Sequence, residues 1–193
     1  MGFARALIHF FYPSYCLYCK GIAEKNHHLL CDTCFELIEW IDPKERCKNC
    51  WGKLPCKGCE KVPRYLPHHL SLFDGFGPIS SLYQHFLKTH QGKGLLSLML
   101  LKLSRSSFPL PDVVTPNSEK YLPLNDPAHL LAKHLAKLIG KPCAPRGEKL
   151  SGQTVLVITP TLTKLDDLIE KQREIRGYFP KKIYSMALID RRA

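Results

Sequence analysis

Cys16-Leu17-Tyr18-Cys19 begins a series of four Cys-x-x-Cys pairs that decides how the first third of this chain folds. Two cysteines separated by two residues can turn both thiolates toward one ion, and two such pairs complete a tetrahedral zinc site. A site of four cysteines leaves no open position for water or substrate, so the role expected of the metal is structural. We therefore predict two zinc ions, held by Cys16, Cys19, Cys31, Cys34, Cys47, Cys50, Cys56 and Cys59.

The sequence leaves the grouping of these pairs open. In chain order, Cys16 to Cys34 bind one ion and Cys47 to Cys59 the other, with spacers of eleven and five residues inside the two groups. Two tandem ribbons are the simplest arrangement. An interleaved cross-brace, which joins the first pair to the third and the second to the fourth, has the same composition.

Four disulfides are the other use for eight cysteines, and they suit a secreted protein. The segment Ala4–Tyr12 is apolar, but His9 interrupts it, and aromatic residues and a proline follow where a cleavage site needs small residues. The longest apolar stretch, Leu95 to Leu101, contains Ser97 and is too short to span a membrane. We therefore expect reduced, zinc-bound cysteines in a cytoplasmic protein.

Length and charge bound the remaining possibilities. A chain of 193 residues fits a small domain and an ordinary one, which we place at residues 1–64 (zinc module) and 65–193. The formal net charge is +11. Eight zinc-bound thiolates and two zinc ions remove about four of these positive charges, so the metal-loaded protein stays basic. A basic protein invites a nucleic-acid interpretation.

Basic residues and a tryptophan cluster around the third and fourth cysteine pairs. Basic side chains can follow a phosphate backbone while an aromatic face stacks on an unpaired base. A solvated surface in which the tryptophan merely covers the zinc site explains the same pattern equally well, because charge alone is a weak motif. The residues expected to contact nucleic acid are Arg46, Lys48, Trp51, Lys53 and Lys57.

The second domain reads as alternating strands and helices. We expect strands at Leu70–Phe73, Asp112–Thr115, Thr154–Ile158 and Lys182–Leu188, and helices at Ile79–Lys88, Leu95–Leu103, Ala128–Ile139 and from a cap at Thr163 to Gly177. This alternation predicts an α/β fold with a mainly parallel sheet and helices on both faces. Ligands of such sheets lie at the carboxyl ends of the strands, which directs attention to the predicted loop Thr159–Thr163.

The order of these parts resembles the ComF family of competence-associated proteins. The resemblance covers nearly the full length and rests on the cysteine pattern together with matches that are individually modest. These matches are Phe11-Tyr12-Pro13 before the first pair, Leu72-Phe73-Asp74-Gly75-Phe76-Gly77-Pro78-Ile79, Asp112-Val113-Val114-Thr115-Pro116, and Gly152-Gln153-Thr154-Val155-Leu156-Val157-Ile158. The resemblance implies a double zinc ribbon followed by a phosphoribosyltransferase-like domain.

The departures from this family concern its nucleotide-binding loop. The resemblance implies that active members carry two adjacent acids after the central strand for the ribose of phosphoribosyl pyrophosphate, then a loop of threonines and glycine for its phosphate. Here Thr159 and Pro160 replace the acids, and Leu165 replaces the glycine that would let the phosphate approach the backbone. We therefore expect no catalysis and no firm binding of phosphoribosyl pyrophosphate or magnesium. The residues left for weak anion binding are Thr159, Thr161, Thr163 and Lys164, which also suffice simply to cap the next helix.

The resemblance implies a role in handling single-stranded DNA during natural transformation. Single-stranded DNA or a DNA-uptake protein is then the expected partner, and the sequence does not reveal the oligomeric state. Two alternatives stay open. One is an active phosphoribosyltransferase with a rearranged site, and the other is a protein–protein adaptor built on the zinc ribbons.

Overall fold

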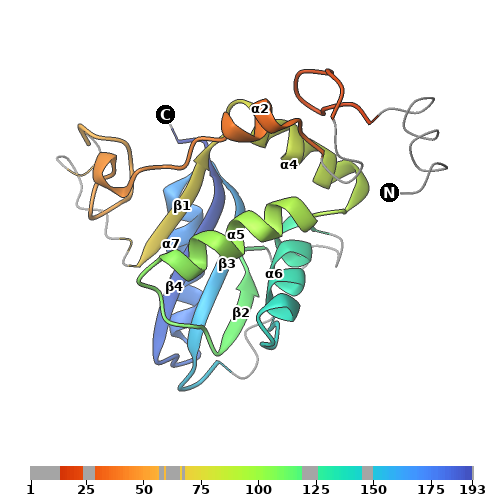
Figure 1. The fold of residues 1–193 in the computed structure, drawn as a ribbon. Coiled ribbons are helices and arrows are strands. Elements are labelled where there is room, and N and C mark those ends of the chain that lie inside the picture. The colour runs from red at the N-terminus through yellow and green to blue at the C-terminus, as the bar shows by residue number, and fades with distance from the viewer. Residues whose placement is uncertain are drawn as a thin grey trace. The chain divides into compact units, whose positions relative to one another are not determined.

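The structure is a computed structural model that describes residues 14–23, 29–56, 59, 66, 68–118, 126–144 and 150–192 (Figure 1). The chain forms two compact units, each made of two separate segments. The amino-terminal unit comprises Met1–Glu39 and Gly75–Leu95, and the sheet unit comprises Trp40–Asp74 and Leu96–Ala193. The boundary between residues 64 and 65 that the sequence suggested lies outside the described residues.

The amino-terminal unit contains the first four cysteines and two helices, α2 (Asp32–Glu36) and α4 (Pro78–Thr89). Gly77 precedes α4 with φ 67°, a left-handed conformation that glycine adopts without strain, and Pro78 suits the first turn. The buried face of α4 is formed by residues three and four positions apart: Ile79, Leu82, Tyr83 and Phe86.

The sheet unit is built on four parallel strands, in the spatial order β1-β4-β3-β2. Helix α5 enters this unit from Leu96 onward, and the helices α6 and α7 connect β2 to β3 and β3 to β4. A short 3-10 helix, η1, precedes β1. The bounds are η1 Pro43–Glu45, β1 His69–Asp74, α5 Lys93–Arg105, β2 Val113–Pro116, α6 Pro127–Leu138, β3 Thr154–Leu162, α7 Leu165–Arg176 and β4 Lys182–Asp190.

The core of the sheet unit lies on both faces of β3. Val155, Leu156, Val157 and Ile158 are all at most 1% exposed, as expected for a parallel strand that is covered on both sides. Figure 1 shows α5 and α6 in front of the sheet and α7 behind it. The predicted α/β fold with a parallel sheet is thus confirmed.

The helix caps agree with the sequence at α6 and differ at α7. Asp126 caps α6 by accepting a hydrogen bond from the His129 backbone N–H at 3.3 Å. Helix α7 begins after Lys164, which is extended and makes no side-chain capping bond, so Thr163 is not the cap residue.

The central strand is longer than its sequence pattern suggested. We expected the central strand to end at Ile158 and a loop to follow, but β3 continues to Leu162. The reason is its neighbour: β4 is equally long, and it pairs with β3 as far as Thr161 opposite Ile189 and Leu162 opposite Asp190. Among the described residues, no helix is long and apolar enough to cross a bilayer.

Candidate functional site

The eight paired cysteines gather in two clusters, in chain order. One contains Cys16, Cys19, Cys31 and Cys34, and the other Cys47, Cys50, Cys56 and Cys59; within each, the ligand atoms all lie within 4.8 Å of one another. The Sγ–Sγ distances of 3.7 Å for Cys19–Cys31, 3.4 Å for Cys50–Cys56 and 3.9 Å for Cys47–Cys59 are close to the edge of a zinc tetrahedron, which is about 3.8 Å for bonds of about 2.3 Å. This grouping is the tandem arrangement, not the cross-brace.

The two clusters begin with the same backbone turn. We call Cys16–Gly21 the first knuckle and Cys47–Gly52 the second knuckle. In each, the N–H of the first cysteine bonds the glycine carbonyl at 2.8 Å, and the glycine N–H donates to the sulfur of the second cysteine at 3.4 Å. An antiparallel bridge flanks each turn, Tyr15 with Ile22 and Arg46 with Lys53.

Each knuckle requires one unusual residue and one glycine. Lys20 and Trp51 occupy equivalent positions with φ 63° and 60°, in the left-handed region that side chains seldom adopt. A Cβ atom on Gly21 would lie 3.4 Å from the Cys19 sulfur, and one on Gly52 would lie 3.3 Å from the Cys50 sulfur. The glycine therefore lets the backbone approach the thiolate that it bonds.

The sulfurs suit a divalent cation because they cannot all be ionised without one. Burial acts to raise the pKa of Cys16, but backbone hydrogen bonds outweigh it and lower this pKa to about 6. In the same cluster, burial and the neighbouring sulfurs raise the pKa of Cys34 to about 12. The second cluster behaves alike, with the pKa of Cys50 raised to about 12 chiefly by burial. A positive ion at the centre would stabilise all four thiolates together. Both donor sets therefore fit zinc, and each is complete without substrate.

The second cluster is part of the sheet unit's core. Cys50 belongs to the same buried cluster as Val155, Val157, Leu168 and Ile183, and its three partner cysteines pack against that cluster. The metal site and the sheet thus share one hydrophobic interior. Removal of this metal should for that reason disturb the sheet, which the sequence did not reveal.

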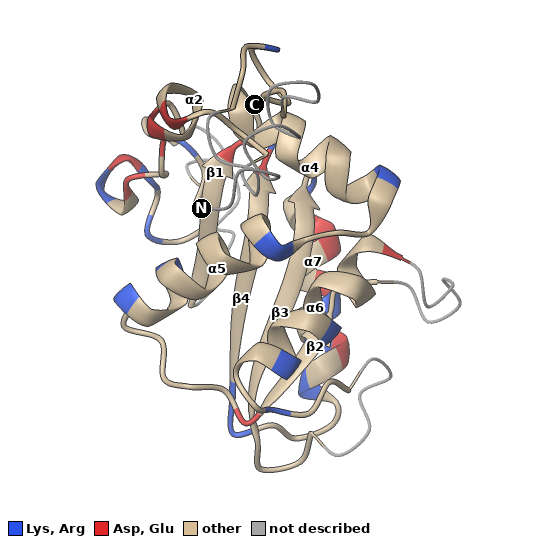
Figure 2. Cartoon of the chain, turned by 45° about the vertical axis from the view of Figure 1, so that its right-hand side comes forward, with Lys and Arg blue, Asp and Glu red and all other residues tan. Residues whose placement is uncertain are grey.

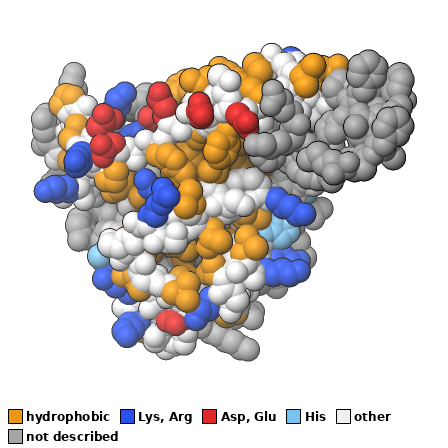
Figure 3. Space-filling model, in the orientation of Figure 1, with side chains coloured by type: hydrophobic (Ala, Val, Ile, Leu, Met, Phe, Trp, Pro, Cys, Tyr) orange, Lys and Arg blue, Asp and Glu red, His pale blue; other side chains and the backbone are white. Residues whose placement is uncertain are grey.

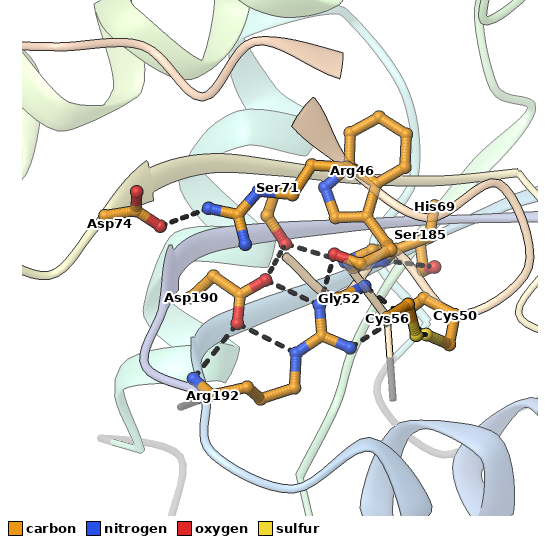
Figure 4. Close-up of polar contacts among 11 residues, drawn as sticks. Arg46, Cys50, Gly52, Cys56, His69, Ser71, Asp74, Ser185, Asp190 and Arg192 are labelled. Carbon is orange, nitrogen blue, oxygen red and sulfur yellow. Dashed lines mark hydrogen bonds and ion pairs between the residues drawn. The ribbon is translucent and has the colours of Figure 1, made fainter. Parts of the chain in front are cut away.

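Arg192 connects the second knuckle to the end of β4 (Figure 4). Its guanidinium donates to the backbone carbonyls of Cys50 at 2.8 Å and Trp51 at 3.1 Å. The same group bonds both carboxylate oxygens of Asp190, at 2.8 and 2.5 Å. Asp190 is 3% exposed, so this ion pair is buried and geometrically fixed.

A buried polar chain continues from Asp190 into β1. The Ser71 hydroxyl donates to Asp190 at 3.0 Å, and the two ring nitrogens of His69 lie 2.9 Å from the Ser71 and Ser185 hydroxyls. Gln172 of α7 donates to Ser185 at 3.1 Å. Every member of this network has a partner, as buried polar groups require.

This network holds His69 neutral. Burial, assisted by the positive charge of Arg192 and opposed by Asp190, lowers the pKa of His69 to about 3. Burial acts to raise the pKa of Asp190, but its bonds to Arg192 and Ser71 outweigh that effect and lower the pKa. The combination of a neutral histidine and an ionised, paired carboxylate is that of a structural network.

The residues expected to contact nucleic acid do not share one environment. Lys48 in the second knuckle and Lys53 directly after it are exposed. Arg46 is 6% exposed and forms an ion pair with Asp74, so its guanidinium is occupied inside the protein. Lys57 lies outside the described residues.

Trp51 belongs to the second knuckle and also borders a pocket. Its ring stands edge-on to His69, with centroids 6.0 Å apart and planes at 88°. Its indole nitrogen is buried and has no hydrogen-bond partner among the described residues. Trp40, which the sequence analysis did not single out, lines the same pocket.

Two of the four residues expected at the nucleotide loop belong to β3, and the other two follow it. Thr159 is 3% exposed, and its hydroxyl accepts a hydrogen bond from the Asn117 side chain at 3.2 Å. Thr161 lies within β3 opposite Ile189, while Thr163 and Lys164 are exposed before α7. Residues 159–162 are therefore strand and not the loop that the sequence suggested, and the Thr159 hydroxyl already has a partner.

Sequence reasoning missed Arg192 and the network beneath it. A signal was present: Ser71 and Ser185 are polar residues inside otherwise apolar strands, and such residues need buried partners. The partner that matters most, Arg192, is distant in sequence from Cys50 and no local pattern joins them.

Comparisons with known proteins add little. Neither the protein-family models nor the curated proteins give a match to this chain. Among solved structures, the HGPRT-ase of Leishmania tarentolae, determined in complex with GMP, is similar over 58% of this chain and 68% of its own, at 13% identity and a TM-score of 0.31. A likeness this weak establishes neither fold nor function.

Proposed function

We propose that this chain is a zinc-stabilised, non-catalytic protein with a phosphoribosyltransferase-like sheet domain that binds single-stranded nucleic acid through the surface around its second knuckle. The proposal rests on the way in which Arg192 attaches that knuckle to the sheet. Arg192 bonds the turn to the end of β4, and half-buried Trp51 lies within it. Lys48 within the turn and Lys53 directly after it are exposed. A rigid turn that carries cations beside an aromatic ring is how proteins bind unpaired strands.

The geometry of β3 supports the non-catalytic part of the proposal. Active phosphoribosyltransferases of the family that the sequence resembles need two acids and a phosphate loop after this strand. Here Thr159 and Pro160 lie within β3, and a proline also lacks a backbone N–H to donate to phosphate. By the same resemblance, the biological process is the handling of incoming DNA during natural transformation, in a reducing compartment where the thiolates can hold zinc.

Binding of a fluorescent oligothymidine, followed by anisotropy as salt is raised, tests the nucleic-acid part. Affinity should fall steeply, with log Kd changing by about 0.7 per phosphate contact for each tenfold rise in salt. The double variant K48A/K53A should weaken binding and reduce this slope. K133A/K137A, which removes two lysines of α6, is the matched control and should behave like wild type. Salt-independent binding would contradict the proposal.

Isothermal titration with phosphoribosyl pyrophosphate and magnesium tests the non-catalytic part. We expect no magnesium-dependent heat. Tight, magnesium-dependent binding would instead support an active phosphoribosyltransferase. Capture of a protein partner that survives nuclease treatment, together with no oligonucleotide binding, would favour an adaptor.

A further inference from the structure

Two neighbouring pockets open on the sheet unit. The first, of about 600 Å³, has Trp40, Trp51, His69, Lys102, Arg105 and Phe108 in its lining. The second, of about 520 Å³, has His68, Arg176, Phe179, Lys181 and Lys182 in its lining. Each contains aromatic rings and basic side chains, and no aspartate or glutamate lines either one.

The two pockets adjoin through consecutive residues and stacked rings. His69 lines the first pocket and His68 the second. Phe108 of the first pocket packs on Tyr184, with centroids 4.7 Å apart, and Tyr184 packs on His68 at 5.1 Å. The Lys182 ammonium lies 5.2 Å from the centre of the same tyrosine ring. Tyr184 is 6% exposed and lines neither pocket, so it joins them as a buried wall between Phe108 and His68. We call the surface formed by the two pockets the aromatic track.

Trp51, which lines the first pocket, carries a hydrogen-bond donor without a partner. Its indole nitrogen is buried and unpaired among the described residues, which is unfavourable unless an acceptor reaches it. A nucleobase supplies such acceptors on its edge and an aromatic face for stacking. Trp40 and Phe108, both half-buried, provide rings in the same pocket.

Five cations border the track: Lys102, Arg105, Arg176, Lys181 and Lys182. Within the described part of the chain, none of them forms an ion pair with a carboxylate. Two acids lie nearby without lining the pockets: Asp42 acts on Lys102, whose pKa burial nevertheless lowers, and Lys181 acts on Asp112. Helix α5 itself carries basic residues and no acidic ones, as Figure 2 shows. Figure 3 shows basic and hydrophobic side chains interspersed on the face that carries α5.

We infer that a single strand of nucleic acid binds along the aromatic track, with an unpaired base in the Trp40–Trp51 pocket and the phosphates following the basic residues toward Phe179. This inference rests on the proposed function and extends it to surfaces outside the zinc ribbon. An acidic peptide would satisfy the cations, but it would supply no flat faces for the rings. Phe179 is 80% exposed with φ 54°, a costly placement for an aromatic side chain that serves only the fold.

Intrinsic fluorescence gives a direct test. The chain contains two tryptophans, Trp40 and Trp51, and both line the first pocket. Saturating oligothymidine should therefore quench the emission, in parallel with the rise in anisotropy of a labelled strand. Anisotropy that rises to saturation while tryptophan emission stays constant would place the strand elsewhere and overturn the inference, although the proposed function would stand.

Substitutions separate the track from the knuckle. Arg105→Ala and Lys182→Ala should each weaken binding about threefold or more and lower the salt slope by about 0.7. Phe179→Ala should weaken it at least about fivefold with the slope unchanged, because it removes stacking and no charge. The matched controls on α6 are Lys137→Ala and Leu138→Ala, at exposed positions.

The outcomes are distinguishable. If wild-type protein binds no oligonucleotide, both the proposed function and the track are excluded. If the track variants bind like wild type while K48A/K53A binds weakly, the knuckle alone holds the strand and the track is wrong. If polyglutamate of matched charge competes as well as oligothymidine, the surface recognises charge without bases, which also overturns the inference.

Discussion

The two knuckles have the same backbone and different surroundings. Both use a Cys-x-x-Cys turn closed by a left-handed residue and a glycine, with matching hydrogen bonds. The first belongs to the amino-terminal unit, while the second shares the core of the sheet and is bonded by Arg192. Both clusters offer a metal ion the same four thiolates, but only the second cluster is packed into the hydrophobic core of the sheet. The second zinc site is as much a part of the α/β domain as β4 is.

Loss of a ligand should have the largest effect, and it should differ between the clusters. Cys50→Ser removes a zinc ligand that is also packed among the core side chains of the sheet, and structural zinc contributes on the order of 10 kcal/mol to folding. We expect this variant to lose one zinc and the protection of β3 amides from hydrogen exchange. Cys19→Ser should lose one zinc and leave β3 protected.

Cys143→Ser is the control for a cysteine outside both clusters, and it should keep two zinc ions. Zinc content by mass spectrometry and amide exchange read out the two effects separately. Equal loss of β3 protection in Cys19→Ser and Cys50→Ser would contradict the difference between the clusters.

The second-largest effect should follow from removing Arg192, which connects the second knuckle to β4. Arg192→Ala leaves the Asp190 carboxylate buried without its cation, and breaking a buried pair in this way costs about 3–5 kcal/mol. Urea unfolding should show this loss in the sheet unit, and a chelator should take zinc from the second cluster faster than in wild type. The exposed neighbour Arg191 is the control, and Arg191→Ala should change the free energy of unfolding by less than about 0.5 kcal/mol.

This pair of arginines shows what sequence could and could not predict. The eight ligands, the parallel sheet and the helices follow from local spacing and periodicity, because these depend on residues near one another. The grouping of the cysteines, the extension of β3 to Leu162 and the burial of Arg46 depend on pairings between distant segments. Arg191 and Arg192 are adjacent and chemically identical, and only the fold distinguishes the buried one.

Acid should weaken the sheet unit through His69. The pKa of this histidine is lowered to about 3 in the folded protein, against about 6.5 when unfolded, so the unfolded chain binds more protons between these values. Stability is therefore lost as pH falls below 6.5, by about 1.4 kcal/mol at pH 5.5. Urea unfolding of wild type and His69→Gln at pH 7.5 and 5.5 measures this contribution.

His69→Gln removes the titrating group. The loss of unfolding free energy between pH 7.5 and 5.5 should therefore be smaller by about 1.4 kcal/mol, even if the variant is already less stable at pH 7.5. His134→Gln, which changes a histidine outside the buried face of α6, is the matched control. An unchanged dependence in His69→Gln would mean that folding does not lower the pKa of His69.

The smallest effect on zinc binding should come from substitution of the knuckle glycines. The comparison of the two glycines tests whether the packing around each cluster changes how its turn tolerates a side chain. Gly52→Ala would place a Cβ 3.3 Å from the Cys50 sulfur and 3.9 Å from that of Cys56, whereas Gly21→Ala meets only the Cys19 sulfur at 3.4 Å. The contact at Gly52 needs a shift of a few tenths of an ångström, whereas the contact at Gly21 is at the edge of ordinary van der Waals distance. The sulfur of Cys19 is exposed and can move, while Cys50 is held in the core. We therefore expect Gly52→Ala to weaken zinc binding a few-fold more than Gly21→Ala in competition with a chelator. Equal losses would show that the turn behaves the same in either setting, and that the difference between the clusters lies entirely outside it.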